Sequence, residues 1–173
     1  MLFRSLCLLY HRVDHPGRYP FLDRFGVPPI PPGDLLNELS FLKMQGANFL
    51  TFSDLRHGYF PRRNQFGVIV SFDDCLRDMY TSGTGVLEWL DIRGVLFQST
   101  ALIDAPTLIW EHALYWHAHD PERAQALEAL AHERLPASRA LVGDALVAHL
   151  RQAEPMAAVE ALLAEAKIGR AHV

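Results

Sequence analysis

Short apolar runs punctuate the first part of the chain. The run at residues 67–72 is nearly continuous and contains β-branched residues, which is the pattern of a strand buried on both faces. Apolar runs at residues 6–10, 48–51 and 95–99 have the length of strands. The hydrophobic pattern therefore predicts four short strands, the third of them in the interior of a sheet.

Helical spacings separate these runs. Asp34 is a reasonable N-cap for one helix, and Gly46 suits its C-terminal end. A turn of helix is predicted from Ser53, and a further helix is predicted to end at Gly94. Alternation of strand and helix indicates a parallel α/β architecture, in which sites form at the carboxyl ends of strands. The apolar positions that define the two longer helices are Leu35, Leu39, Leu42, Val86, Leu87 and Leu90.

The composition changes in the last third of the chain. Every Phe, Tyr and Trp lies in residues 1–119, and residues 120–167 are rich in Ala, Leu, Glu and Arg. Helices are predicted to begin at Asp120, near Ser138 and near Glu154. We therefore predict a division between residues 1–119 and a helical insertion or extension at residues 120–167. The apolar faces of its helices are predicted to contain Leu127, Leu130, Val142, Leu146, Leu150, Val159 and Leu162.

The composition is that of a folded globular chain, because 50% of the 173 residues are hydrophobic and 21% are charged. A formal net charge of −4 provides no positive field for a phosphate backbone, so no nucleic-acid partner is expected. Two cysteines, Cys7 and Cys75, are too few for a disulfide framework. No apolar run approaches the roughly 20 residues that cross a bilayer, and no signal peptide is evident. We expect a cytoplasmic protein without a membrane partner, and its oligomeric state stays open.

Two adjacent carboxylates, Asp73 and Asp74, directly follow the apolar run at residues 67–72. Consecutive strand residues point to opposite faces, so these side chains meet different partners unless the backbone turns there. The position is typical of catalytic residues in α/β proteins. A capping aspartate with a solvated neighbour fits the same spacing equally well. The spacing by itself leaves both interpretations open.

The residues around this doublet resemble a known family. Residues 8–13 read Leu-Leu-Tyr-His-Arg-Val, residues 71–75 read Ser-Phe-Asp-Asp-Cys, and residues 95–100 read Val-Leu-Phe-Gln-Ser-Thr. In this order they resemble the polysaccharide deacetylases, the NodB homology or carbohydrate esterase family four, whose first catalytic motif reads Thr-Phe-Asp-Asp-Gly. The resemblance covers about residues 6–117. It implies the front part of a distorted (β/α) barrel of the glycoside hydrolase/deacetylase type, followed by an all-helical C-terminal segment.

The resemblance assigns roles to the doublet. Asp73 matches the family's catalytic base and Asp74 matches its metal-binding carboxylate, with a divalent cation, often zinc, completed by two histidines. Such a cation lowers the pKa of its bound water towards about 7, and the resulting hydroxide attacks the acetamide carbonyl of an N-acetylated carbohydrate. His11 ends the first apolar run and is expected at the same rim of the sheet. It either supports the site or bonds to a neighbouring loop.

The chain also departs from the family pattern. The family's second motif is a His-x-x-x-His further along the chain, and none of the nine histidines is expected to have a histidine partner at this spacing. We therefore expect the ligand motif to be missing and metal binding to be weak or absent. The densest histidine cluster, at residues 112, 117 and 119, does not have the spacing of a pair on one helical face, so surface or capping roles are expected for it. Cys75 replaces a glycine whose backbone angles cost other residues about 1 to 2 kcal/mol.

The sequence thus indicates a polysaccharide deacetylase-like protein, truncated and inactive as given, whose family hydrolyses N-acetyl groups on carbohydrates. The alternative is a non-catalytic remnant of the same fold that binds a glycan or a protein partner. Residues 168–173 match one reading frame of a common sequencing adapter, so they are predicted to be a non-native tail. Chance agreement over this short stretch is the competing explanation.

Overall fold

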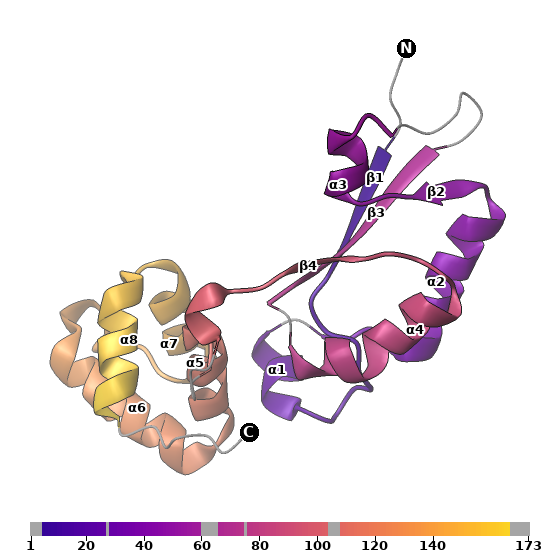
Figure 1. Cartoon of the computed structure of the whole chain (residues 1–173). Coiled ribbons are helices and arrows are strands. Elements are labelled where there is room, and N and C mark those ends of the chain that lie inside the picture. Colours follow the sequence, from indigo (N-terminus) through magenta and orange to yellow (C-terminus); the bar gives the residue numbers. More distant parts are fainter. Residues whose placement is uncertain (1–4, 27, 60–65, 75, 104–107, 167–173) are drawn as a thin grey trace. The chain divides into compact units, whose positions relative to one another are not determined.

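The computed structural model describes residues 5–26, 28–59, 66–74, 76–103 and 108–166. Contacts between Cα atoms group the chain into two compact units (Figure 1). The first unit comprises Met1–Arg18 and Val27–Ser99, and the second comprises Tyr19–Gly26 and Thr100–Val173. Each unit has a hydrophobic core of its own. The predicted domain division at residues 119 and 120 and the non-native tail at residues 168–173 stay predictions, and that tail lies outside the described residues.

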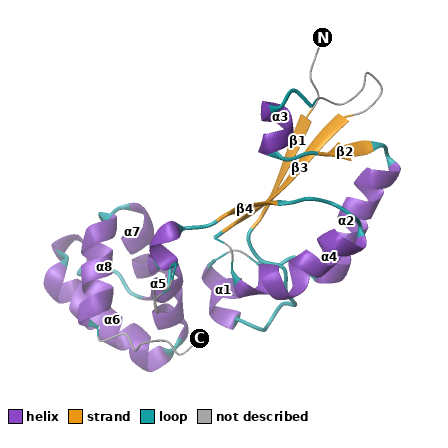
Figure 2. Cartoon of the chain, in the orientation of Figure 1, coloured by secondary structure: helices purple, strands orange, loops and turns teal. Residues whose placement is uncertain are grey.

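A four-stranded parallel sheet forms the centre of the first unit (Figure 2). Its strands are β1 (Ser5–Tyr10), β2 (Ala47–Phe49), β3 (Phe66–Asp73) and β4 (Val95–Phe97). β1 pairs along one edge of β3, whereas β2 pairs with the first part of the other edge and β4 with its last part. β3 is therefore the central strand, and its interior residues are buried. The prediction of a parallel α/β sheet around this run is confirmed.

Two helices of the first unit, α2 (Pro32–Met44) and α4 (Thr84–Trp89), supply apolar side chains to its core. The short helix α3 (Phe52–Arg56) belongs to the same unit and has no buried residue. The predicted N-cap of the first helix was wrong, because Pro31 is the N-cap and Asp34 lies in the first turn. Proline suits the start of a helix because its missing N–H would have no partner there. The core combines alternate residues of β3 with helical side chains: Val68, Val70, Phe72, Leu35, Leu39, Val86 and Leu87.

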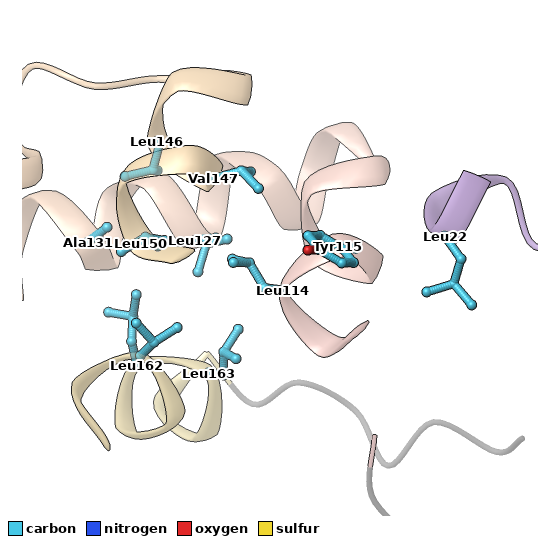
Figure 3. Packing of buried hydrophobic residues seen from close by; sticks show 11 residues of the cluster. Leu22, Leu114, Tyr115, Leu127, Ala131, Leu146, Val147, Leu150, Leu162 and Leu163 are labelled. Atoms are coloured by element: carbon cyan, nitrogen blue, oxygen red, sulfur yellow. The ribbon is translucent and has the colours of Figure 1, made fainter. Parts of the chain in front are cut away.

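The second unit is built from helices. It contains α1 (Pro20–Phe25), α5 (Trp110–His119), α6 (Pro121–Arg134), α7 (Gly143–Gln152) and α8 (Met156–Glu165). Its core brings together leucines from all five of these helices with Tyr115 of α5 (Figure 3). The largest fully buried side chains of this core are Leu114, Leu127, Leu146, Leu150 and Val159. Burial of such side chains contributes about 1.5 to 3 kcal/mol each and holds these helices together.

The predicted helix starts have mixed outcomes. Asp120 caps α6 as expected, since its carboxylate accepts a hydrogen bond from the Arg123 N–H at 3.0 Å. The start predicted near Ser138 was wrong, because Ser138 lies in the 3-10 turn Pro136–Ser138 and α7 begins five residues later at Gly143. Val142 was expected on an apolar face and is 60% exposed. None of the helices in the described ranges is long and apolar enough to cross a membrane.

Candidate functional site

Asp73 is the last residue of β3, at the carboxyl end of the central strand. Its Cα partner on β4 is Phe97, and the preceding Phe72 pairs with Tyr10 of β1 and Leu96 of β4. The Asp73 side chain is half-buried, and its Oδ1 atom is buried without a hydrogen bond from any described residue. An ionised carboxylate is only an acceptor, so this oxygen can take a hydrogen bond from water or a ligand.

Asp74 adopts a left-handed backbone conformation, with a φ angle of 64°. This region costs most residues with a Cβ about 1 to 2 kcal/mol, and aspartate is among those that enter it most readily. The strand alternation therefore ends at Asp73, and the two carboxylates are presented from a turn. Asp74 is half-buried. Cys75, the predicted departure from the family motif, lies outside the described residues.

His11 is the first residue after β1, whose last residue, Tyr10, pairs with Phe72. Because Asp73 follows Phe72 directly, His11 and Asp73 lie at the carboxyl edge of two neighbouring strands. The His11 side chain is half-buried. Its position is the one predicted from the sequence, whereas its support of the site stays a prediction.

One histidine pair has the spacing of the family's ligand motif. His11 and His15 are four positions apart, so the expectation that this spacing is missing holds only for the chain after the doublet. His15 is exposed, and neither histidine lies in a helix, so they do not share a helical face. Within the described ranges, no three side chains of His, Cys, Asp or Glu are close enough together to hold a metal ion. The spacing alone does not make a metal site.

Three charged residues that follow the two strand ends are buried. Arg12, Asp14 and Asp78 are 2%, 2% and 6% exposed. Arg12 Nε lies 3.6 Å from Asp78 Oδ2, and Asp14 Oδ1 accepts hydrogen bonds from the His15 N–H at 2.8 Å and from Arg18 Nη1 at 3.3 Å. Buried charges are costly unless they are paired. This charge cluster therefore ties the segment after β1 to the segment after β3.

The electrostatics of Asp78 follow from this burial. Loss of water raises the pKa of the Asp78 carboxyl, and the neighbouring Asp14 carboxylate raises it further. The Met79 N–H and the Arg12 guanidinium act in the opposite direction, and burial outweighs them. The cluster was not predicted from the sequence. Charged residues that follow an apolar run within a few positions were the available signal.

A π-helix, η1 (Met79–Gly83), connects this cluster to α4. The Asp78 Oδ1 atom accepts a hydrogen bond from the Met79 N–H at 2.8 Å. Gly83 packs so closely that a Cβ there would lie 2.2 Å from Met79 Sδ and 3.2 Å from Val13 Cγ2. π-helical turns are rare and often occur at functional sites. Here the π-helix packs against Val13, the residue after Arg12.

The histidines of the second unit have separate surroundings. Burial, reinforced by the Arg123 charge, lowers the pKa of His117 to about 4, and His117 is 3% exposed. The expectation of a surface or capping role for His117 was therefore wrong. The Nε2 atom of His132 lies 2.8 Å from the Leu141 carbonyl oxygen, and that of His149 lies 3.1 Å from Glu154 Oε1. The rings of His132 and His149 are therefore each within hydrogen-bond distance of a neighbouring protein oxygen.

Comparisons with known proteins give similarities to deacetylase structures. No family model matches the chain. No curated protein matches it either. A de-N-acetylase from Aggregatibacter actinomycetemcomitans is 23% identical, with a TM-score of 0.47, over 61% of this chain and 42% of that one. The chain thus spans less than half of that structure.

Two other solved structures are similar over most of the chain. IcaB from Ammonifex degensii is 18% identical, with a TM-score of 0.49, over 95% of this chain and 81% of that one. The Streptococcus pyogenes deacetylase PplD, in complex with acetate, is 16% identical, with a TM-score of 0.47, over 92% and 79% of the two chains. All three TM-scores are below 0.5. A function for this chain therefore has to rest on its own residues.

Proposed function

We infer that the chain carries part of the active site of a metal-dependent carbohydrate deacetylase of the polysaccharide deacetylase (NodB) type. The observation that carries this proposal is the position of Asp73 and Asp74 in a turn at the carboxyl end of the buried central strand. Active sites of parallel α/β proteins form at this edge. The order of the motifs along the chain supports the same assignment. The sheet would be the first part of the family's distorted barrel.

Asp73 is proposed as the general base. Its Oδ1 atom is buried and accepts no hydrogen bond from a described residue, so it can accept a proton from an attacking water molecule. The water oxygen forms a bond to the acetamide carbon, the C–N bond breaks, and the amine leaves with a proton. The products are acetate and a carbohydrate with a free amine. General bases of this kind typically contribute about 100-fold to 10,000-fold in rate.

Asp74 is proposed as one ligand of a divalent cation, with zinc as the family's usual metal. Structural and catalytic zinc sites in proteins have at least three protein ligands. The described residues do not fit a complete set, because no three candidate ligands lie close together among them. We therefore propose that the chain binds the cation weakly.

The alternative function is binding without catalysis. It is favoured by the same incomplete ligand set, since a glycan-binding or partner-binding remnant needs no cation. The two functions differ in what Asp73 and Asp74 do. A deacetylase site uses Asp74 to hold the cation and Asp73 to move a proton, whereas a remnant needs neither role.

Titration with Co²⁺, followed by its visible absorption, tests the ligand role. Asp91 is the matched control, since it is an exposed aspartate with a positive φ of 51°. We expect weak binding by the parent chain, at least tenfold weaker binding by Asp74→Asn, and unchanged binding by Asp91→Asn. Equal binding by Asp74→Asn and the parent chain would remove Asp74 from the site. Absence of any binding at millimolar Co²⁺ would favour the non-catalytic alternative.

Acetate release from chitin oligomers, measured with added zinc, tests catalysis. We expect the parent chain to release acetate no faster than Asp73→Asn. A parent rate at least 100-fold above that of Asp73→Asn, with Asp91→Asn fully active, would show a complete site and contradict the proposed inactivity.

A further inference from the structure

Two half-exposed phenylalanine rings contact each other, and one of them belongs to the strand partner of Asp73. Phe97 of β4 is 49% exposed and Phe52 at the start of α3 is 48% exposed, and their ring centroids are 6.0 Å apart. Phe97 is the Cα partner of Asp73, and paired residues on neighbouring strands share one face of the sheet at a spacing of about 4.8 Å. Through Phe97, the Phe52–Phe97 pair thus adjoins a carboxylate whose buried Oδ1 atom accepts no hydrogen bond from the described residues.

Local interactions hold this pair in place. Thr51 caps α3, since its hydroxyl accepts a hydrogen bond from the Asp54 N–H and the Asp54 side chain accepts one from the Thr51 N–H at 2.7 Å. Arg93, two residues before β4, donates from Nη2 to both carboxylate oxygens of Asp54, at 3.0 and 2.9 Å. The start of α3 is therefore bound to the start of β4. Phe52 and Phe97 are brought together by these two elements before any ligand arrives.

We propose that the Phe52–Phe97 pair is the stacking surface for the sugar ring of an N-acetylated carbohydrate. An aromatic face packs on the apolar C–H face of a sugar, and the adjacent carboxylate accepts hydrogen bonds from hydroxyl or amide groups. The same carboxylate repels an anionic ligand. A neutral ligand with one apolar face and several donors matches this surface, and a neutral carbohydrate has this chemistry. The proposal names the substrate contact of the proposed deacetylase site and therefore rests on that function.

Titration of the full chain with N-acetylglucosamine trisaccharide, followed by amide chemical shifts in NMR spectra, tests the proposal. Phe97→Leu keeps an apolar side chain and removes the ring, whereas Phe97→Tyr keeps the ring. Phe41→Leu is the control, because Phe41 is 56% exposed on α2. We expect Phe97→Leu to weaken binding about 2-fold to 12-fold, the range that aromatic contacts give. Phe97→Tyr and Phe41→Leu should bind like the parent chain.

Parent-like affinity of Phe97→Leu overturns the proposal, as does absence of saccharide binding by the parent chain. If Phe97→Leu does not fold, Phe52→Leu decides by the same criterion. A parent chain that dimerises in sedimentation experiments, and that Phe97→Leu makes monomeric, would assign the surface to a second copy and also overturn the proposal. The Co²⁺ titration of Asp74 uses no saccharide. Failure of the stacking surface and failure of the deacetylase site are therefore distinguished.

Discussion

The buried pair of Arg12 and Asp78 provides a sharp test of how the candidate site is held together. Arg12 is the cation of a cluster that also contains the buried carboxylate of Asp14. Replacing it by methionine in Arg12→Met keeps a long side chain and removes the charge. Two buried carboxylates then remain without the guanidinium. We expect this variant to lose more stability than a typical surface substitution.

The magnitude follows from distance and burial. At 3.6 Å, with an effective dielectric constant of about 20, the attraction between the two charges is about 4 to 5 kcal/mol. The side chains are 2% and 5% exposed, so water cannot replace the lost partner. Removal of one member of a buried pair typically costs about 3 to 5 kcal/mol. Asp78→Asn should cost less, because the amide oxygen can still accept a hydrogen bond from the Met79 N–H.

The pH dependence gives the prediction a sign. Burial raises the pKa of Asp78 above the ordinary value of an aspartate carboxyl. Its titration therefore contributes stability at a pH below that ordinary pKa, and this contribution is lost as the pH rises through the pKa of the folded state. Without Arg12 the pKa should rise further. The difference in unfolding free energy between Arg12→Met and the parent chain should therefore shrink as the pH falls from 7 to 5.

Amide hydrogen exchange in β3 measures this stability within the first unit. Arg93→Met is the control, since its ion pair with Asp54 is shorter, at 2.9 Å, but Arg93 is 67% exposed. An exposed pair of this kind contributes at most about 1 kcal/mol. If Arg12→Met lowers the free energy of unfolding no more than Arg93→Met does at either pH, burial of the Arg12–Asp78 pair does not govern its contribution to stability.

Two further predictions concern a buried histidine and a close-packed glycine. His117 should stay neutral down to a pH of about 4 in an NMR titration of its ring, and because its pKa is lowered, its contribution to the free energy of unfolding should be present above pH 6.5 and fall by up to about 3 kcal/mol towards pH 4. His117→Phe should abolish this pH dependence of stability, and a pH dependence that persists in the variant would contradict its assignment to His117. Gly83→Ala should destabilise the first unit by about 1 to 3 kcal/mol in chemical unfolding, because the new Cβ would overlap Met79 Sδ. The control Gly85→Ala, whose Cβ would meet no atom within 4 Å, should be neutral or stabilising, and equal effects of the two variants would contradict the close packing of Gly83.

Hydrophobic runs predicted the sheet well, because a strand buried on both faces has few sequence alternatives. The helix starts were predicted less accurately, because those predictions depended on residue types that form caps and turns. Ser138 has the residue type of an N-cap, yet its hydroxyl donates at 2.8 Å to the carbonyl oxygens of Ala131 and Leu135, and so it completes the end of α6. The same side chain can serve either end of a helix, and only the tertiary structure decides. The π-helix after Asp78 has no sequence signal of this kind.

The candidate site divides in the same way between local and tertiary information. Asp73 and Asp74 were predicted because a polar doublet after an apolar run is visible in the chain itself. The tertiary contacts around this doublet were not predicted. The register that pairs Phe97 with Asp73, and the contact of Arg12 with Asp78, join segments far apart in sequence. Average hydropathy assigns an arginine to the surface. In a parallel sheet, however, residues that directly follow neighbouring strands meet at one edge, so charges there are candidates for burial together.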